Sequence, residues 1–132
     1  MNQLCLRQIR PCVVIVVSMI AFSSHASELD KLFDEYRTKG VRTFDPIAGE
    51  ALWRQEFGGK SCTSCHTESP RQFGRHERTG KSIEPVAPSV NPDRLTDLRH
   101  MKKWLLRNCK STLGRECTAQ EKGDILTWLR DQ

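Results

Sequence analysis

Two pairs of cysteines are the residues of this chain whose type and spacing best suit chemistry. The first pair, Cys62 and Cys65, lies in the segment CTSCH, which matches the pattern C-x-x-C-H. Two thiols separated by two residues on one turn can each add to a vinyl group of the same porphyrin, and the next histidine then lies under the iron. We therefore predict one covalently bound haem c, attached through Cys62 and Cys65, with His66 as the proximal axial ligand.

Other chemistry is open to the same two thiols. A zinc site would need two more ligands beside Cys62 and Cys65, and Cys109 and Cys117 would have to approach them. A thioredoxin-like redox pair is usually found in a βαβ context, for which the sequence has no pattern. With either alternative, the long polar segment after His66 would have no group to enclose.

The N-terminus indicates export. Arg7 and Arg10 precede a nearly continuous apolar run at 13–22, and Ser24 and Ala26 place small residues at a cleavage site. This is the layout of a secretory signal peptide, and a run of about ten residues is too short to span a bilayer. We expect residues 1–26 to be removed and residues 27–132 to form a soluble periplasmic monohaem domain. The alternative is an uncleaved anchor.

The charge of the chain excludes some partners. Removal of the signal peptide takes away two arginines and no acidic residue, so the formal net charge falls from +5 to +3. Such a mild charge, without basic residues interleaved with aromatic ones, does not indicate nucleic-acid binding. The length of 132 residues and the absence of repeats indicate a single domain.

The second cysteine pair, Cys109 and Cys117, lies in the segment RNCKSTLGREC. Free thiols rarely persist in an oxidising compartment, and these two have no other partner once CTSCH is assigned. A disulfide between them is therefore the first expectation, and Gly114 lets the chain turn back. The disulfide would also fix the position of Asn108, which directly precedes Cys109.

The elements that must position these residues are almost all helical. Apolar periodicity and capping residues predict helices from Ser27 to Gly40, from Asp45 to Phe57, from Thr96 to Asn108 and after Thr118. Residues 60–92 show little periodicity, and no stretch has a sustained strand alternation. A helix before C-x-x-C-H, a wrapping loop and a C-terminal helix fit an all-α class I cytochrome c fold with an extra N-terminal helix.

The sixth iron ligand has several candidates. Methionine or histidine would keep the iron six-coordinate in both redox states, which suits a simple electron carrier. The mature chain offers Met101, His76 and His100, but Met101 falls inside a helical pattern and often such a residue only fills the core. Asn108 follows Met101 by seven residues and Trp104 by four, so the three share one helix face. By itself, such an asparagine is more often a cap.

The sequence resembles the sphaeroides haem protein family, whose members are high-spin class I cytochromes c that bind oxygen. The similarity covers most of residues 44–130 and rests on the segments CTSCHTESPRQFGRHERTGK, EPVAPSVNPDRLTD and KKWLLRNCKSTLGRECTAQEKGDILTWL. The resemblance implies that Asn108 is the distal ligand of the ferric haem and leaves on reduction. It also implies a disulfide between Cys109 and Cys117.

These observations lead to three functional hypotheses. The first is a cytochrome that accepts electrons from a partner and binds oxygen, nitric oxide or carbon monoxide at the opened iron. By resemblance, its donor is a dihaem cytochrome c or a membrane cytochrome b. We expect a monomer or weak dimer, and the residues leave open whether it turns over, by oxygen reduction or nitric oxide dioxygenation. The second is a plain electron carrier with Met101 as permanent ligand, and the third is a gas sensor or store.

Overall fold

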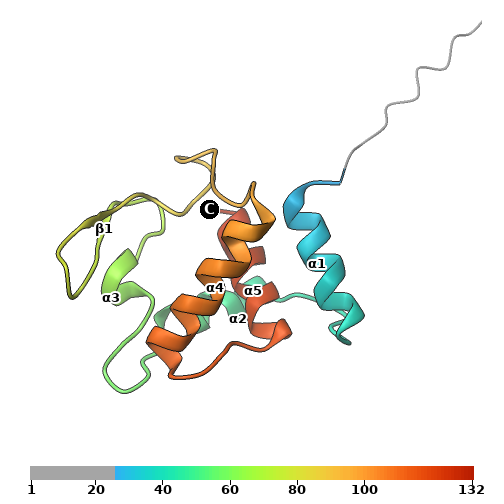
Figure 1. Ribbon diagram of the computed structural model, residues 1–132, viewed down its shortest axis with the longest axis horizontal. Helices are drawn as coiled ribbons and strands as arrows, with labels where there is room; N and C mark the ends of the chain where they lie inside the picture. Colours follow the sequence, from blue (N-terminus) through green and yellow to red (C-terminus); the bar gives the residue numbers. More distant parts are fainter. Residues whose placement is uncertain (1–25) are drawn as a thin grey trace, which may run out of the picture.

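The computed structural model describes residues 26–132, so the predicted signal peptide lies, except for its last residue, outside the described residues. Within that range the chain forms five helices and one short hairpin. The first helix, α1, stands at one end of the molecule, and α3 stands with the hairpin at the other (Figure 1). The all-α class predicted from the sequence is confirmed. The elements are α1 Glu28–Thr38, α2 Pro46–Arg54, α3 Thr63–His66, β1 Gly74–Arg75, β2 Ser82–Ile83, α4 Leu98–Leu113 and α5 Ala119–Arg130.

Side-chain caps begin three helices where the sequence predicts them. Ser27 and Asp30 form a capping box at the start of α1, and Thr118 and Glu121 form another at the start of α5. Asp45 caps α2 and is followed by a proline in the first turn. Each cap satisfies a backbone N–H that has no partner within the first helical turn. The predicted starts of these helices are confirmed.

The helix α2 ends earlier than predicted. It stops at Arg54 instead of Phe57, because the backbone of Phe57 pairs with Lys60 across a tight turn. Gly58 and Gly59 occupy that turn, and both have positive φ. A two-residue turn of this kind favours glycine, because other residues rarely adopt the left-handed region.

The helix α4 continues beyond its predicted end at Asn108. Cys109 and Leu113 extend its inward face, and Gly114 ends it with a φ of 72°. Asn108 therefore lies within α4, one and a half turns before its end. The interpretation of Asn108 as a helix cap is wrong for this reason.

The helices α2 and α5, which precede C-x-x-C-H and end the chain, cross at close range. A Cβ atom on Gly49 would lie 2.2 Å from the carbonyl oxygen of Asp124. Beside the crossing, the ring centroids of Trp53 and Trp128 are 5.2 Å apart. Only a residue without a side chain permits this approach of the two backbones. The crossing fixes the chain that leads into CTSCH against the C-terminal helix.

Buried apolar side chains form two clusters that meet at Leu95 and Leu105. The first cluster joins α1 to α4 and α5, and the second joins α2 to α5 and extends toward α3. The buried members of the first are Leu29, Leu32, Phe33, Tyr36, Val41, Met101 and Leu126. The buried members of the second are Leu52, Trp53, Ile125, Trp128 and Leu129.

The segment 67–97 contains no helix, and its Val86 and Leu95 pack against the second cluster. Gly74 pairs with Ile83 and Arg75 with Ser82 in a small antiparallel hairpin. Two-residue strands leave no alternating pattern, so the sequence did not predict them. Across residues 26–132, the structure contains no helix with the length and apolar character needed to cross a membrane.

Candidate haem site

The thiols and imidazole of CTSCH lie on one short helical turn. Cys62 precedes α3, and its carbonyl oxygen accepts hydrogen bonds from the N–H groups of Cys65 at 3.3 Å and His66 at 3.0 Å. The hydroxyl of Ser64 accepts a hydrogen bond from the backbone N–H of Ser61 at 3.0 Å. These bonds hold the two cysteines and the histidine on a single turn. The segment therefore has the compact form that double thioether attachment requires.

The two cysteines of α3 are free thiols, and both are half-buried. Cys62 packs against the second cluster, and burial raises the pKa of its thiol to about 11. A zinc site would require more ligands, and no group of three or more His, Cys, Asp and Glu side chains gathers in the part of the chain that the structure describes. Cys109 and Cys117, which the zinc alternative needed, are joined to each other.

The imidazole of His66 is half-buried beside Trp53, with ring centroids 5.4 Å apart. Burial, with a smaller effect from the charge of Arg94, lowers the pKa of His66 to about 4. The side chain is therefore neutral at pH 7, and neutral imidazole is the form that ligates a metal. Trp53 is itself held by a hydrogen bond from its indole N–H to the carbonyl oxygen of Thr67 at 3.2 Å.

The back of α3 is closed by the hairpin. A Cβ atom on Gly74 would lie 2.0 Å from the carbonyl oxygen of Cys65. Beneath this contact is a cavity of about 360 Å³, lined by side chains of α3 and both strands. The hairpin thus supports the side of α3 that carries Cys65. The sequence offered no signal for this role, because Gly74 has an ordinary φ and stands in a polar segment.

The second cysteine pair forms a disulfide between Cys109 and Cys117, with Cα atoms 5.5 Å apart. Both residues are buried, and the bond ties the C-terminal half of α4 to the chain that enters α5. Asn108, directly before Cys109, is exposed. The disulfide fixes the backbone of Asn108 while its side chain stays free of protein partners among the hydrogen bonds of residues 26–132.

The other candidate ligands lie apart from α3. Met101 is buried in the first cluster, among side chains of α1 and α5. His76 is exposed in the hairpin, where its Nδ1 accepts a hydrogen bond from the backbone N–H of Thr79 at 3.3 Å. His100 is exposed beside Trp104. Met101 therefore fills the core, as methionines in helices often do.

The groups on α3 and α4 border the same apolar region. Cys62 of α3 and both Leu105 and Leu113 of α4 are partly buried and pack against the second cluster. Trp104, one turn before Asn108, is 41% exposed. The structure thus brings the attachment segment and the inward face of α4 to one apolar region, whose members from these two elements are only partly buried.

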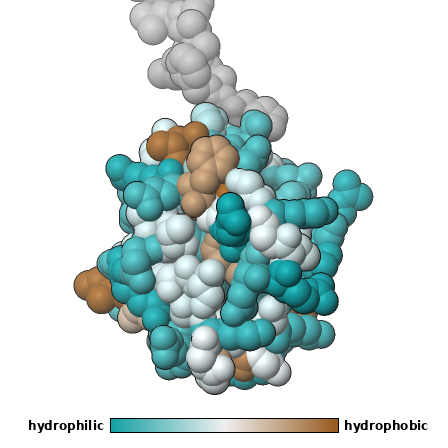
Figure 2. Space-filling model, turned by 90° about the vertical axis from the view of Figure 1, so that its left-hand side faces the viewer, coloured by the Kyte–Doolittle hydropathy of each residue, from teal (hydrophilic) through white to brown (hydrophobic). Residues whose placement is uncertain are grey.

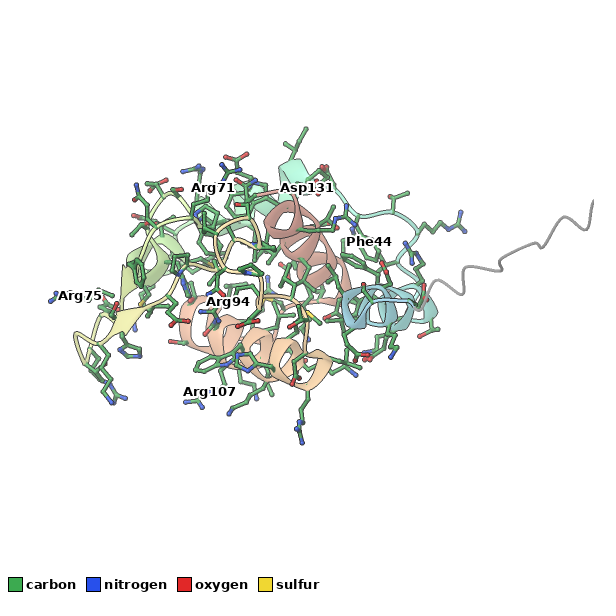
Figure 3. The ribbon with its side chains drawn as sticks, turned by 90° about the horizontal axis from the view of Figure 1, so that it is seen from above. Phe44, Arg71, Arg75, Arg94, Arg107 and Asp131 are labelled. Atoms are coloured by element: carbon green, nitrogen blue, oxygen red, sulfur yellow. A yellow bond between two sulfur atoms is a disulfide. The ribbon has the colours of Figure 1, made fainter. Side chains whose placement is uncertain are left out.

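Arg94 is a residue of the site that the sequence did not reveal. Its Nε donates to the carbonyl oxygen of Pro85 at 2.9 Å, and its Nη2 donates to that of Glu84 at 3.3 Å. Figure 3 shows Arg94 within the molecule between the long segment and α4, whereas Arg75 and Arg107 point outward. Burial is the main cause of the lowered pKa of His66, and the charge of Arg94 adds a smaller effect, since a second positive charge there is disfavoured.

Known proteins resemble this chain over most of its length. A family model described as a domain of unknown function (DUF1924) matches residues 39–129. The cytochrome c-type protein SHP of Cereibacter sphaeroides is 48% identical over 107 residues, which cover 77% of this chain and 82% of that protein. Cytochrome c'' of Methylophilus methylotrophus is 31% identical over 132 residues, which cover 88% of this chain and 91% of that protein.

Solved structures of the same two proteins share the fold. Oxidised SHP, described as an oxygen-binding cytochrome c, superimposes with a TM-score of 0.74 at 40% identity. The match covers 82% of this chain and all of SHP. Oxidised cytochrome c'' superimposes with a TM-score of 0.68 at 28% identity, covering 80% of this chain and 94% of the relative. The class I cytochrome c fold predicted from the sequence is confirmed by these matches.

Proposed function

Since this chain belongs to the DUF1924 family and is 48% identical to the c-type cytochrome SHP, we propose that it is a monohaem electron-transfer protein with a gas-binding iron. The observation that carries the proposal is the pairing of two elements around one apolar region. The short helix α3 presents two free thiols and a neutral imidazole, and α4 presents Asn108 beside a buried disulfide. When bound, the haem supplies a redox-active iron with a coordination position that a diatomic gas can take.

The residues present fit a covalently attached haem. Cys62 and Cys65 have no other covalent partner, and one helical turn holds them beside His66. Leu105 and Leu113 of α4 are only partly buried, so they offer apolar surface that the protein itself does not fully cover. Covering this surface would remove water from apolar atoms, which is favourable. Cys62 and Cys65 would hold the porphyrin by thioether bonds, and His66 would ligate the iron.

Asn108 would serve as the distal ligand in the ferric state. A side-chain amide is neutral and is a weaker donor than imidazole or a thioether, so it binds ferrous iron poorly. The disulfide limits the movement of the backbone at Cys109, while the exposed side chain of Asn108 is free to turn. Asn108 would therefore hold ferric iron and leave after reduction, which opens the position to oxygen, nitric oxide or carbon monoxide. The relative SHP is itself described as an oxygen-binding cytochrome c.

Met101 is the basis of the competing function, a plain electron carrier with a permanent ligand. Its side chain is 6% exposed and belongs to the cluster that joins α1 to α4 and α5. It would have to leave that cluster to reach an iron held by His66, which packs against Trp53 of the other cluster. The packing of Met101 therefore favours the gas-binding proposal.

The cellular setting of the proposal follows the resemblance. We place the protein in the periplasm after removal of residues 1–26, as a monomer or weak dimer. A dihaem cytochrome c or a membrane cytochrome b would donate the electrons. Turnover would be oxygen reduction or nitric oxide dioxygenation. A steady consumption of gas with a reductant separates either activity from a sensor or store, which binds without turnover.

Visible spectra of the purified protein test the proposal directly. The pyridine haemochrome spectrum should be that of haem c with two thioether bonds. The ferrous protein should be high-spin, and carbon monoxide should shift its Soret band. A low-spin ferrous spectrum that carbon monoxide leaves unchanged would contradict an opened iron and support a permanent ligand.

A further inference from the structure

The helices of this protein differ in whether their basic residues form ion pairs. Every lysine and arginine of α1, α2 and α5 forms an ion pair, most often with a carboxylate of the same helix. The helix α4 contains five basic residues and no acidic one, and only Lys102 is paired, with Glu35 of α1. Within residues 26–132, the cations of α4 without an ion pair are Arg99, Lys103, Arg107 and Lys110.

These four residues form one exposed stripe along α4, which we call the cationic stripe. Their spacing of four, four and three places them on one side of the helix. The stripe is bordered by Trp104, 41% exposed, and Leu106, 37% exposed. Lys103 and Arg107 also lie over the indole of Trp104, at 5.8 Å and 5.2 Å from the ring centroid. Cations surrounding apolar side chains are typical of interfaces with a polar rim.

The fold does not explain why these charges are unpaired. Like charges at a spacing of four repel each other along a helix, and Arg99 stands in the first turn, where the helix dipole disfavours a cation. The helices α1 and α2 avoid such costs with acidic neighbours in the same helix. An external acidic surface would satisfy all four cations at once.

We propose that the cationic stripe is the docking surface for an acidic electron-transfer protein. This proposal rests on the proposed function, because it assigns a place to the electron donor. A second copy of this chain would present the same positive charge and be repelled. Transient redox complexes have small interfaces, and opposite charge increases their rate of association. A partner on the stripe would be separated from the inward face of α4 by one helix diameter, about 10–12 Å.

The hairpin supplies a matched control. Arg75 and Arg78 belong to the segment between α3 and α4, are exposed, and form no ion pair in the part of the chain that the structure describes. The end of the molecule that carries the hairpin is mostly hydrophilic, with apolar groups only in small separate areas (Figure 2). Arg75→Glu with Arg78→Glu changes the net charge by the same four units as Lys103→Glu with Arg107→Glu. The two double variants therefore separate a local surface from the total charge.

The test uses the holoprotein and a plant-type ferredoxin, which is a small acidic iron–sulfur protein, as the probe. Stopped-flow absorbance gives the second-order rate of haem reduction by reduced ferredoxin, from low to high ionic strength. At low ionic strength, the rate for the α4 double variant should fall to about one tenth of that of the unchanged protein, or lower. The rate for the hairpin variant should stay within about twofold of that of the unchanged protein. High salt should bring the three rates together. Equal losses in both variants would overturn the docking surface and leave only a net-charge effect.

A second measurement separates this proposal from the proposed function. Titration of ¹⁵N-labelled protein with oxidised ferredoxin should shift amide resonances of α4, and the α4 double variant should lose these shifts. Binding at α4 without electron uptake would preserve the surface but contradict electron transfer. The last measurement uses vesicles that contain phosphatidylglycerol. If the protein binds these vesicles through the stripe and does not bind ferredoxin, the partner is a membrane surface, and the proposal of an acidic protein partner is wrong.

Discussion

At the scale of single residues, His66 and Asn108 differ in how firmly the fold holds them. His66 is half-buried and packs against Trp53, which is in turn hydrogen-bonded to the backbone just after α3. Asn108 is exposed, and only its backbone is restrained, by α4 and by the disulfide of Cys109. A permanent ligand requires the first kind of support and a displaceable ligand the second. The two environments therefore agree with the roles proposed for these side chains.

Replacing Asn108 by alanine tests the distal role. Asn108→Ala should convert the ferric spectrum to that of a five-coordinate or water-ligated haem, because the amide is gone. The ferrous spectrum should stay as it was, since the amide has already left in that state. Ser111→Ala, one turn further along the exposed part of α4, is the control and should change neither spectrum. An unchanged ferric spectrum of Asn108→Ala would remove the ligand role.

Glu121 makes stability depend on pH. Its hydrogen bonds with Arg115, and then the backbone N–H of Thr118, lower the pKa of this carboxyl from 4.5 to about 2. A lowered pKa in the folded state means stabilisation that is complete above about pH 4.5 and is lost as the pH falls toward 2. Because the side chain is partly exposed, solvent reduces the size of this effect.

Glu121→Gln should lower the free energy of unfolding by about 1–2 kcal/mol at pH 7. The difference from the unchanged protein should shrink between pH 4.5 and pH 2, as the wild-type carboxyl becomes protonated. Urea unfolding across this pH range measures both values. Glu56→Gln, an exposed carboxyl without an ion pair among residues 26–132, should show no such dependence. A constant difference at all pH values would show that charge is not the cause.

At the scale of elements, α4 is fixed at both ends by different means. Its first half is attached to α1 through Met101 in the first cluster and the ion pair of Lys102 with Glu35. Its second half is attached to the start of α5 by the disulfide. The inward face of α4 is therefore held in place along its whole length. The extra N-terminal helix thus has a structural role in positioning α4.

Removing the disulfide tests its contribution to α4. Cys109→Ser with Cys117→Ser should lower the free energy of unfolding by about 2–3 kcal/mol, since the closed loop is short. Denaturant unfolding of the holoprotein measures this. A thiol count on the denatured, unreduced protein is the companion measurement, and it should find no free cysteine once haem blocks Cys62 and Cys65. Two titratable thiols would contradict the bond.

The crossing of α2 with α5 depends on one missing side chain. Gly49→Ala would place a Cβ atom 2.2 Å from the carbonyl oxygen of Asp124, so the helices must separate. We expect a loss of about 2–3 kcal/mol in the free energy of unfolding. Ile47→Ala, at a side chain 78% exposed on the same helix, should stay within about 0.5 kcal/mol. Equal stability of both variants would show that the crossing can widen freely.

At the scale of the whole molecule, the two apolar clusters are unequally complete. The first consists of seven buried side chains that α1, α4 and α5 enclose. The second is closed on the side of α2 and α5, but its α3 side includes partly buried residues such as Cys62, Val86 and Leu113. A small domain buries only about two-thirds of its chain surface, so such an opening is costly without a further apolar group. The haem would complete the second cluster.

The protein without haem should therefore lose order unevenly. In Cys62→Ala with Cys65→Ala, residues 60–92 should exchange their amide hydrogens much faster than in the holoprotein, because their apolar support is missing. Amides of α5 near Leu126 should remain protected, since the first cluster does not depend on haem. Hydrogen exchange followed by mass spectrometry measures the difference. Uniform protection across both clusters would mean that the protein alone completes its core.

Local patterns were sufficient for much of the fold. The caps at Ser27, Asp45 and Thr118 depend on a few neighbouring residues, so the sequence predicted them correctly. The end of α4 was predicted wrongly at Asn108, because Cys109 and Leu113 continue its buried face only in the presence of α5 and the disulfide. Gly74 and Arg94 were missed because their contacts join segments that are distant in the sequence or irregular.

By itself, the sequence predicted the covalent chemistry and identified the family of this protein. The spacing within CTSCH is a property of one turn, and family resemblance is a property of the chain, so neither needs the fold. The tertiary structure decided which side chains have a common environment. It placed Met101 among the side chains of α1 and left Asn108 exposed beside a buried disulfide. Such burial depends on contacts between distant segments, which periodicity along one helix does not specify.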